Sequence, residues 1–420
     1  MYEYLCFLSI LSILILVFAY IKIRYPFWNI QPVYHTYDYW RWFYKTPFLI
    51  QRSAPRGSSK TKFYSKNVKT IAYSDATDED KTKLVDLVQC YWSLSDRILI
   101  TMDSEYIHNI LTGHNHPSYI SFYNDVVFGL IPKSDDDPDS LLTRQDYPIG
   151  CMVSYPTRIF MWNQEGNSIE TPAYTWDLLC IHREHREKLF DRQIIQTHEF
   201  NQRLMNSEIS VSFFKREEKL CEGIVPLVEF KTCMFYLRNV RIPPLLPNFL
   251  VTRIHEQNLG ILSDFLYGIS HTTSPMFRLC AFPEMGSLVA KIKAQQLYVY
   301  ALKHKDDIHG VYFFKNSKVV YEELENGNLL ECSATVSNTR HDGVFFAGFL
   351  HALRGVLDNA KNSEKFEYKL ITFATLGHNG KILEKWRWKY TPIVELKAAY
   401  YIYNMVVPGT PFSQDSVMVL

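Results

Sequence analysis

Residues 176–195, WDLLCIHREHREKLFDRQII, constrain the fold more than any other part of this sequence. They begin with a short apolar run at 178–181, whose length and composition are typical of a buried strand. A basic turn follows, and Phe190, Ile194 and Ile195 then recur at helical spacing. The free N–H groups and the dipole of a helix start favour anions. The segment therefore predicts a strand–turn–helix unit that can hold phosphate, and an ordinary strand before a solvated basic helix start is the alternative.

The same segment resembles the strand–loop–helix of the N-myristoyltransferase family, which reads approximately N-F-L-C-V-H-K-K-L-R-S-K-R. In that family the strand splays from its neighbour, and two freed backbone N–H groups bind the thioester oxygen of myristoyl-CoA. By resemblance these donors belong to Leu178 and Leu179. Preorganised donors aimed at a developing oxyanion are often a large term in acyl transfer. The resemblance further implies acyl-CoA contacts from Cys180, Ile181, Arg183, Arg186 and Lys188.

A second match lies near the start of the chain, where residues 24–33 read RYPFWNIQPV. It is similar to the family element F-W-x-T-Q-P-V, whose Phe-Trp backbone touches acyl-CoA. The resemblance assigns this contact to Phe27 and Trp28, with Pro26 before them and Ile30 in place of Thr. An aromatic belt beside a membrane span is the alternative, because an apolar segment ends just before it.

A third match closes the chain, where residues 398–420 read AAYYIYNMVVPGTPFSQDSVMVL. The family closes on Y-Y-L-Y-N-W-x-C-P and an apolar strand. An α-carboxylate is costly to bury, so an apolar run to the last residue predicts a terminus tucked inside the protein. The resemblance implies that the Leu420 carboxylate is the base for the substrate's N-terminal glycine. Burial raises the pKa of a carboxylate and lowers that of an ammonium, which brings both toward a useful range.

Several family positions are changed in this chain. Asp177 replaces the Asn before the Phe-Leu pair, and Cys221 replaces a Thr that faces the reacting amine; we predict both as amine-side contacts. The G-x-G-D-G loop is absent and leaves only Glu395, while the acidic run after the first helix keeps one acid, Asp96. By resemblance, the peptide contacts are Tyr91, Asp96, Glu395 and Asn404.

The predicted phosphate turn also departs from the family pattern. Glu187, Leu189 and Asp191 replace Ser, Arg and Ala. Two acids beside a pyrophosphate are unfavourable unless they point away from it.

Residues 4–21 are almost entirely apolar and carry no charge, which predicts a short membrane span. Lys22 and Arg24 follow it, and the positive-inside rule then places the bulk of the chain in the cytoplasm. A cleaved signal peptide is the alternative, although a basic start and a small-residue cleavage site are not evident.

Composition narrows the remaining classes. The 420 residues are 47% hydrophobic, which allows a large core, and the net charge of +1 gives no sign of nucleic-acid binding. Eight scattered cysteines without a C-x-x-C pair fit free thiols rather than a zinc site. His114 and His116 look like a metal pair but lack a third spaced ligand, and His182 and His185 fit donors on a turn. We predict no metal, and no cofactor besides myristoyl-CoA as co-substrate.

The order of elements favours an α/β (α+β) fold with acetyltransferase-like (GNAT-type) mixed sheets, flanking helices and one N-terminal transmembrane helix. The resemblance implies that the acetyltransferase-like unit is duplicated. Residues 77–80 are expected to open a helix as a capping box. Further expected helices are 104–111, 188–205, 252–266 and 344–360; expected strands include 149–155, 158–162, 176–181, 208–214, 222–228 and 329–337. The expected division is a membrane anchor at 1–24, an acyl-CoA-binding half at 25–245, and a peptide-binding half with the catalytic C-terminus at 246–420.

The resemblance implies transfer of a myristoyl group from myristoyl-CoA to the N-terminal glycine of proteins, by a membrane-anchored enzyme facing the cytoplasm. Its partners would be acyl-CoA, glycine-initiated peptides or proteins and the membrane, without nucleic acid. A non-catalytic descendant that binds acyl-CoA, lipid or a myristoylated partner is the alternative. An acyltransferase that uses another acyl chain or amine is a third reading.

Overall fold

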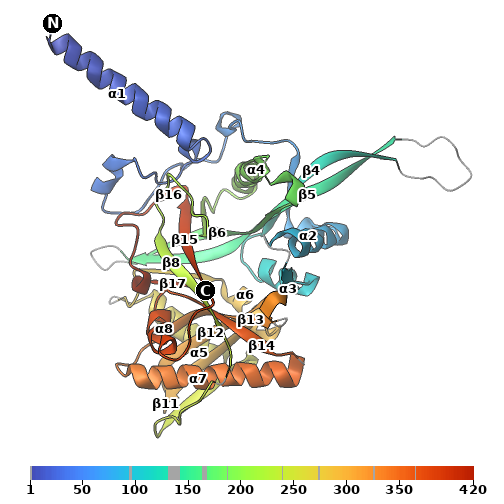
Figure 1. The fold of residues 1–420 in the computed structure, drawn as a ribbon, viewed down its shortest axis with the longest axis vertical. Helices are drawn as coiled ribbons and strands as arrows, with labels where there is room; N and C mark the ends of the chain where they lie inside the picture. The colour runs from blue at the N-terminus through green and yellow to red at the C-terminus, as the bar shows by residue number, and fades with distance from the viewer. Residues whose placement is uncertain are drawn as a thin grey trace, which may run out of the picture.

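The computed structural model describes residues 2–93, 97–130, 142–162, 168–186, 188–238, 240–272, 275–324, 327–364 and 366–420. One apolar helix stands outside a body in which helices pack on a long mixed sheet (Figure 1). The mixed α/β class predicted from the sequence is confirmed.

Helix α1 (Tyr2–Arg24) is the apolar segment near the start of the chain. Its 23 residues span about 34 Å at 1.5 Å per residue, close to the roughly 30 Å of a bilayer's hydrocarbon core. The stretch Cys6–Arg24 is long and apolar enough to cross a membrane, and none of it is buried against the body. Figure 1 shows α1 projecting away from the sheet. It is therefore not a core helix.

The first half of the body is a sheet in the order β2–β4–β5–β6–β7. Strands β6 and β7 are parallel and are joined through α4, so they form a β–α–β unit. Helices α2 and α3 precede the long β4–β5 hairpin. The bounds are β2 (Val68–Ala72), α2 (Asp78–Tyr91), α3 (Ser104–Leu111), β4 (Tyr119–Leu130), β5 (Leu142–Trp162), β6 (Ser168–Ile181), α4 (Phe190–Met205) and β7 (Val211–Glu217).

The second half repeats this plan in the order β9–β11–β12–β13–β14, again with one parallel pair, β13–β14, joined through a helix, α7. Its bounds are β9 (Phe249–Ile254), α5 (Leu259–Ser270), α6 (Met285–Lys293), β11 (Leu297–His304), β12 (Asp307–Tyr321), β13 (Gly327–Ser337), α7 (Asp342–Asn359), β14 (Tyr368–Ala374) and α8 (Asn379–Arg387). Three short strands lie outside this order: β1 (Phe48–Leu49), β3 (Ile98–Ile100) and β16 (Met405–Val406). The repeat fits the predicted duplication.

The two halves exchange a strand. β8 (Val228–Tyr236), which lies before the predicted boundary at 245, pairs with β14 of the second half. β15 (Val394–Tyr403), near the end of the chain, pairs with β7 of the first half, and β8 and β15 pair with each other. One continuous sheet therefore runs through both halves. Strands β10 (Leu279–Pro283) and β17 (Val417–Val419) extend it on the far side of β5.

Local sequence signals account for several elements. Thr77 caps α2 by accepting from the Asp80 N–H, while the Asp80 carboxylate accepts from the Thr77 N–H, which is the predicted capping box. The apolar positions of α7 pack on the second half of the sheet, where Phe345, Phe349 and Leu353 are fully buried.

Two predicted elements are wrong. Residues 252–266 were expected to form one helix, but Phe249–Ile254 is strand β9, paired with β11, and α5 starts only at Leu259. Residues 222–228 were expected to be a strand, but β8 begins at Val228. Gly223 has a φ of +84°, and Pro226 cannot donate to a sheet, so this stretch is a loop.

Candidate functional site

Strands β6 and β7 separate in the middle of the first half. They pair only from Ala173 with Val211 to Trp176 with Phe214. Beyond that point β6 continues along β5 on one side, and β7 continues along β15 on the other. The strand that carries the predicted donor pair therefore leaves its neighbour one residue before Asp177, as the sequence resemblance implies.

A bulge lies directly after this separation. Asp177 pairs with Val153 and Cys180 pairs with Cys151, so Leu178 and Leu179 together face the single residue Met152. Leu178 has a φ of +49° and is only 2% exposed. A left-handed conformation costs about 1–2 kcal/mol for a residue with a Cβ atom. The surrounding packing must therefore hold this backbone in its unusual shape.

The bulge also changes which face of the sheet each side chain meets. Leu178 and Cys180 pack with α2, whereas Trp176, Leu179 and Ile181 pack with α4 and the N-terminal segment. Without the bulge, residues 176 and 179 would face opposite sides of the strand. The two predicted donors thus lie where the strand passes from one cluster to the other.

The Asp177 carboxylate occupies one of the two predicted donors. Its Oδ1 accepts from the Leu178 N–H at 2.8 Å, and its Oδ2 accepts from the Tyr155 hydroxyl at 3.4 Å. Sequence comparison placed Asp177 beside the reacting amine. The structure instead directs its side chain back onto the backbone of the donor pair, so any oxyanion bound there must displace it.

Charged side chains from distant elements gather near Asp177, and the sequence analysis missed them. The Lys291 Nζ, on α6, lies 5.5 Å from the centre of the Tyr155 ring. Lys315 of β12 faces Glu331 of β13 at 3.9 Å, and these two side chains stay 41% and 34% exposed, so water reaches this cluster. Burial and the Lys315 charge lower the pKa of the Lys291 amine, while the Asp177 carboxylate acts in the opposite direction. No local motif marks these residues because only the fold assembles them.

The Phe-Trp element lies beside the separated strands. Phe27 is 3% exposed and contacts the Phe63 ring with centroids 5.1 Å apart. The Trp28 ring stacks on Phe214, the last β7 residue paired with β6, at 5.8 Å, and Pro26 directly precedes this pair. These contacts place the element at the separation, and they make it part of the core rather than an aromatic belt.

Cys221 belongs to this aromatic cluster. Its backbone N–H donates to the Tyr401 hydroxyl at 3.1 Å, and its side chain packs with the cluster that includes Leu179. Burial raises the pKa of the Cys221 thiol to about 12, so the thiol stays protonated at neutral pH. The two predicted amine-side contacts, Asp177 and Cys221, lie in different clusters.

The basic turn is held by Arg186. Its Nη2 donates to the carbonyls of Tyr91, at 2.8 Å, and Ser93, at 3.1 Å, and its Nε donates to the Ile181 carbonyl at 3.2 Å. This guanidinium therefore fastens the turn to the end of α2. The remaining predicted phosphate contacts, Arg183 and Lys188, have exposed side chains.

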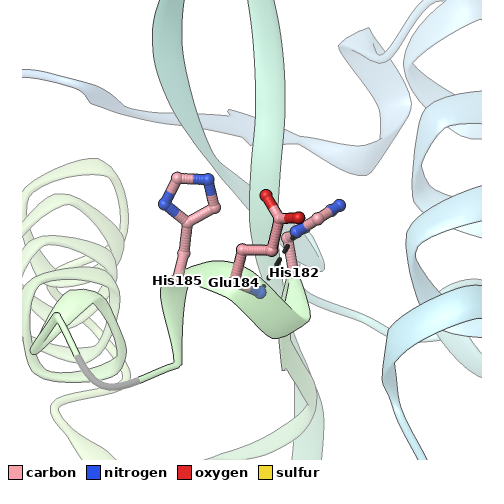
Figure 2. A group of neighbouring side chains, drawn as sticks. All are labelled: His182, Glu184 and His185. Atoms are coloured by element: carbon pink, nitrogen blue, oxygen red, sulfur yellow. Dashed lines mark hydrogen bonds between the residues drawn. The ribbon is translucent and has the colours of Figure 1, made fainter.

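Figure 2 shows His182, Glu184 and His185 projecting from the same turn. Their ligand atoms lie within 4.8 Å of one another and could hold a metal ion. However, the His182 Nδ1 accepts from the Glu184 backbone N–H at 3.4 Å, and the Lys188 Nζ lies 3.4 Å from the His185 Nδ1. A lysine ammonium beside a ligand atom disfavours a cation there.

His114 and His116, the other candidate metal ligands, contact different partners. The His114 Nε2 lies 3.0 Å from the Ile110 carbonyl, whereas the His116 Nδ1 lies 3.6 Å from the Glu208 carboxylate.

The C-terminus is built into the sheet. β17 runs parallel to β10, the Leu420 N–H donates to the Ala281 carbonyl at 2.9 Å, and the half-buried Leu420 packs with the cluster containing Phe160 and Phe282. Figure 1 marks the C-terminus against the middle of the body. The apolar run at the end of the chain is therefore a strand of the sheet, and burial of the Leu420 carboxylate stays a prediction.

The sheet register sets the position of the terminus relative to the bulge. Val419 pairs with Ala281 of β10, so Leu420 is level with the next β10 residue, Phe282. Phe282 in turn pairs with Arg158 of β5. Asp177 pairs with Val153 of β5. Val153 precedes Arg158 by five residues, which is about 17 Å along an extended strand. β17 runs opposite to β5, so the terminus points toward the bulge from that distance along the sheet.

The predicted peptide contacts are distributed over three places. Tyr91 contacts the basic turn, with its ring 4.5 Å from that of His182. Glu395 forms ion pairs with Arg387 at 2.6 Å and Lys231 at 3.3 Å. Asp96 lies outside the described residues.

Asn404 has a structural role. It is fully buried with a φ of +64°, and its Nδ2 donates to the carbonyls of Gln51 and Ser210 at 2.9 Å each. Its Oδ1 accepts from the Gln51 N–H at 2.8 Å. Both amide hydrogens are thus used inside the protein, so this side chain has none to offer a substrate.

Comparison with known proteins identifies the fold. No protein family and no curated protein sequence matches this chain. Two crystal structures of Saccharomyces cerevisiae N-myristoyltransferase with bound myristoyl-CoA match it at TM-scores of 0.63 and 0.64, with 11% sequence identity in both cases. The first covers 92% of this chain and 94% of the yeast chain, and the second covers 94% of each. The chain therefore has an N-myristoyltransferase-like fold.

Proposed function

We propose that this protein is an acyltransferase that moves a myristoyl group from myristoyl-CoA to the N-terminal glycine of proteins. One observation carries the proposal: within this fold, β6 leaves β7 at Trp176 and bulges at Leu178 and Leu179, where a thioester oxygen needs two backbone donors. The yeast proteins of the same fold were crystallised with myristoyl-CoA.

In the proposed reaction the glycine amine attacks the thioester carbonyl. A C–N bond forms, the C–S bond breaks, and CoA leaves as the thiol by taking the proton that the nitrogen loses once it has attacked. The Leu178 and Leu179 N–H groups stabilise the oxyanion once the Asp177 carboxylate has moved aside. Before the attack, the Leu420 carboxylate takes one proton from the glycine ammonium. The register separates the terminus from the bulge by about 17 Å along the sheet, so this step requires the last residues to move toward the bulge. No protein nucleophile is needed because CoA is a good leaving group, and the protonated Cys221 thiol agrees with this.

The acyl-CoA would lie along the separated strands. Phe27 and Trp28 border the acyl end, together with Leu179 and Ile181 from the same aromatic cluster. The exposed Arg183 and Lys188 would contact the CoA phosphates, while Arg186 keeps the turn in place.

A membrane anchor follows from α1, whose apolar side chains the body does not cover. Lys22 and Arg24 in its last turn support a body on the cytoplasmic side, by the positive-inside rule.

A second candidate function is non-catalytic binding of acyl-CoA or of a myristoylated protein. The hydrogen bond from the Leu178 N–H to the Asp177 carboxylate favours it, because this bond competes with the oxyanion.

The deciding experiment incubates the full chain with radiolabelled myristoyl-CoA and a glycine-initiated peptide. The same peptide starting with alanine is the control. We expect label on the glycine peptide only. Binding of a non-transferable thioether analogue of myristoyl-CoA without peptide labelling would favour the binding function instead.

The role of the terminus is tested by adding two glycines after Leu420. The extension moves the carboxylate away and should abolish transfer, whereas Leu420→Ala keeps a terminal carboxylate at the same position and should retain it. Equal activity in both variants would contradict the assignment of the base.

A further inference from the structure

The connection between α1 and the body is short and fixed at both ends. Only Tyr25 and Pro26 lie between Arg24, the last residue of α1, and the buried Phe27. The Tyr25 N–H still donates to the Ile21 carbonyl at 2.9 Å, and Arg24 pairs with Glu222 of the body at 2.6 Å. Three residues reach about 10 Å when fully extended. If α1 spans a bilayer, as proposed above, the surface beside its end must lie close to the lipid headgroups.

An aromatic segment is exposed on this part of the body. It consists of residues 39–45, which contain the short helix Tyr39–Phe43. Tyr39 and Trp40 are each 71% exposed, Phe43 is 84% exposed and Tyr44 is 54% exposed. Phe43 and Tyr44 border a hollow of about 400 Å³ that Trp162 and Arg278 also line. Figure 1 shows this segment, in blue, on the side of the body from which α1 projects.

Asp38 directly precedes the aromatic segment, but the chain from the segment onward carries charge of one sign. From residue 39 to residue 66 the chain has no Asp or Glu; its basic residues are Arg41, Lys45, Arg52, Arg56, Lys60, Lys62 and Lys66. Tyr and Trp collect at membrane–water interfaces, and basic residues near a span are attracted to anionic headgroups. Phe27 and Trp28, the aromatic pair next to α1, are packed into the core and do not fill this role.

We propose that residues 39–45 lie in the headgroup layer of the bilayer that α1 crosses, with the basic stretch to residue 66 on its anionic surface. This second contact would hold the body against the membrane in one orientation. The proposal rests on α1 being a membrane span and does not depend on the acyl-transfer reaction.

The test uses the full chain in vesicles of phosphatidylcholine and phosphatidylserine. In a background with the exposed cysteines removed (Cys6→Ser, Cys90→Ser), Phe43→Cys carries an environment-sensitive fluorophore. Trp388→Cys is the matched control, because Trp388 is 79% exposed and follows α8, on a part of the body distant from α1 in Figure 1. A third protein keeps only Cys6 of this pair and reports on α1 itself.

We expect the label at position 43 to emit at shorter wavelength and to be quenched by spin-labelled headgroups but not by aqueous iodide. The label at position 388 should behave in the opposite way. Iodide quenching at position 43 equal to that at 388, with Cys6 quenched by lipid, would overturn the proposal while leaving the span intact. A shift at 43 that grows with protein density and ignores the lipid spin label would identify a second copy as the occupant, and would also overturn it.

Discussion

Replacing Asp177 with Asn tests whether its carboxylate restrains the proposed oxyanion site. Asp177→Asn keeps the shape of the side chain and removes its charge. A hydrogen bond to a charged group is worth about 1.5–3 kcal/mol, compared with about 0.5–1.5 kcal/mol for a neutral one. Freeing the Leu178 N–H should therefore cost about 1–1.5 kcal/mol less in the variant, which corresponds to about a 5- to 13-fold faster chemical step.

The assay is single-turnover transfer at saturating myristoyl-CoA and saturating peptide, which separates the chemical step from any loss of amine binding at position 177. Infrared spectra of bound, isotope-labelled acyl-CoA give a second measurement, because a stronger donor lowers the stretching frequency of the thioester carbonyl. Tyr155→Phe is the control, since it removes only the other partner of the carboxylate. An Asp177→Asn protein with an unchanged rate and an unchanged carbonyl frequency would refute the reasoning.

Three further predictions concern residues whose contacts are fixed by the structure. Asn404→Ala breaks three buried hydrogen bonds and places alanine at a φ of +64°, so it should lower the free energy of unfolding in urea by about 3–5 kcal/mol; Asn404→Gly, which tolerates this φ, should lose about 1 kcal/mol less. Arg186→Ala should lower the free energy of unfolding by about 2–4 kcal/mol, and Arg186→Lys should not restore it, because three hydrogen bonds to carbonyls depend on the guanidinium. Unchanged stability with weaker acyl-CoA binding would instead mean that Arg186 binds acyl-CoA. Burial lowers the pKa of the fully buried His198 to about 3, so only the unfolded chain takes up this proton between about pH 6.5 and pH 3, and stability falls as the pH falls through that range. His198→Gln should flatten this dependence by an amount on the order of 4 kcal/mol, and equal slopes in acid titrations of both proteins would contradict it.

The sequence predicted the elements that local patterns specify. The strand at 176–181, its cationic turn and the helix from 190 appear in the structure because the apolar run, the charges and the helical spacing lie within twenty residues. The α2 capping box and the amphipathic α7 are local in the same sense. The second half was harder to predict. The β9 sequence FLVTRI has apolar residues at both strand and helix spacings, and only its pairing with β11 makes it a strand.

The site could be predicted only in part. Resemblance located the separation of the strand beside Leu178, but it could not show that the Asp177 side chain turns back onto the Leu178 N–H. Lys291 and Lys315 come from α6 and β12, more than one hundred residues from Asp177, and no spacing along the chain links them. The predicted role of Asn404 in peptide binding came from the resemblance, whereas its structural role follows from burial and hydrogen bonding, which the motif does not encode.

The exchange of β8 and β15 has a consequence for how the protein is made. The first half needs β15 to complete its sheet, and that strand ends at Tyr403 of a 420-residue chain. During synthesis from the N-terminus, the outer edge of β7 stays open until β15 has emerged, more than 170 residues after β7. An open strand edge readily pairs with other chains. We therefore expect truncated versions ending before Val394 to aggregate, and neither half to be obtained as a stable protein alone.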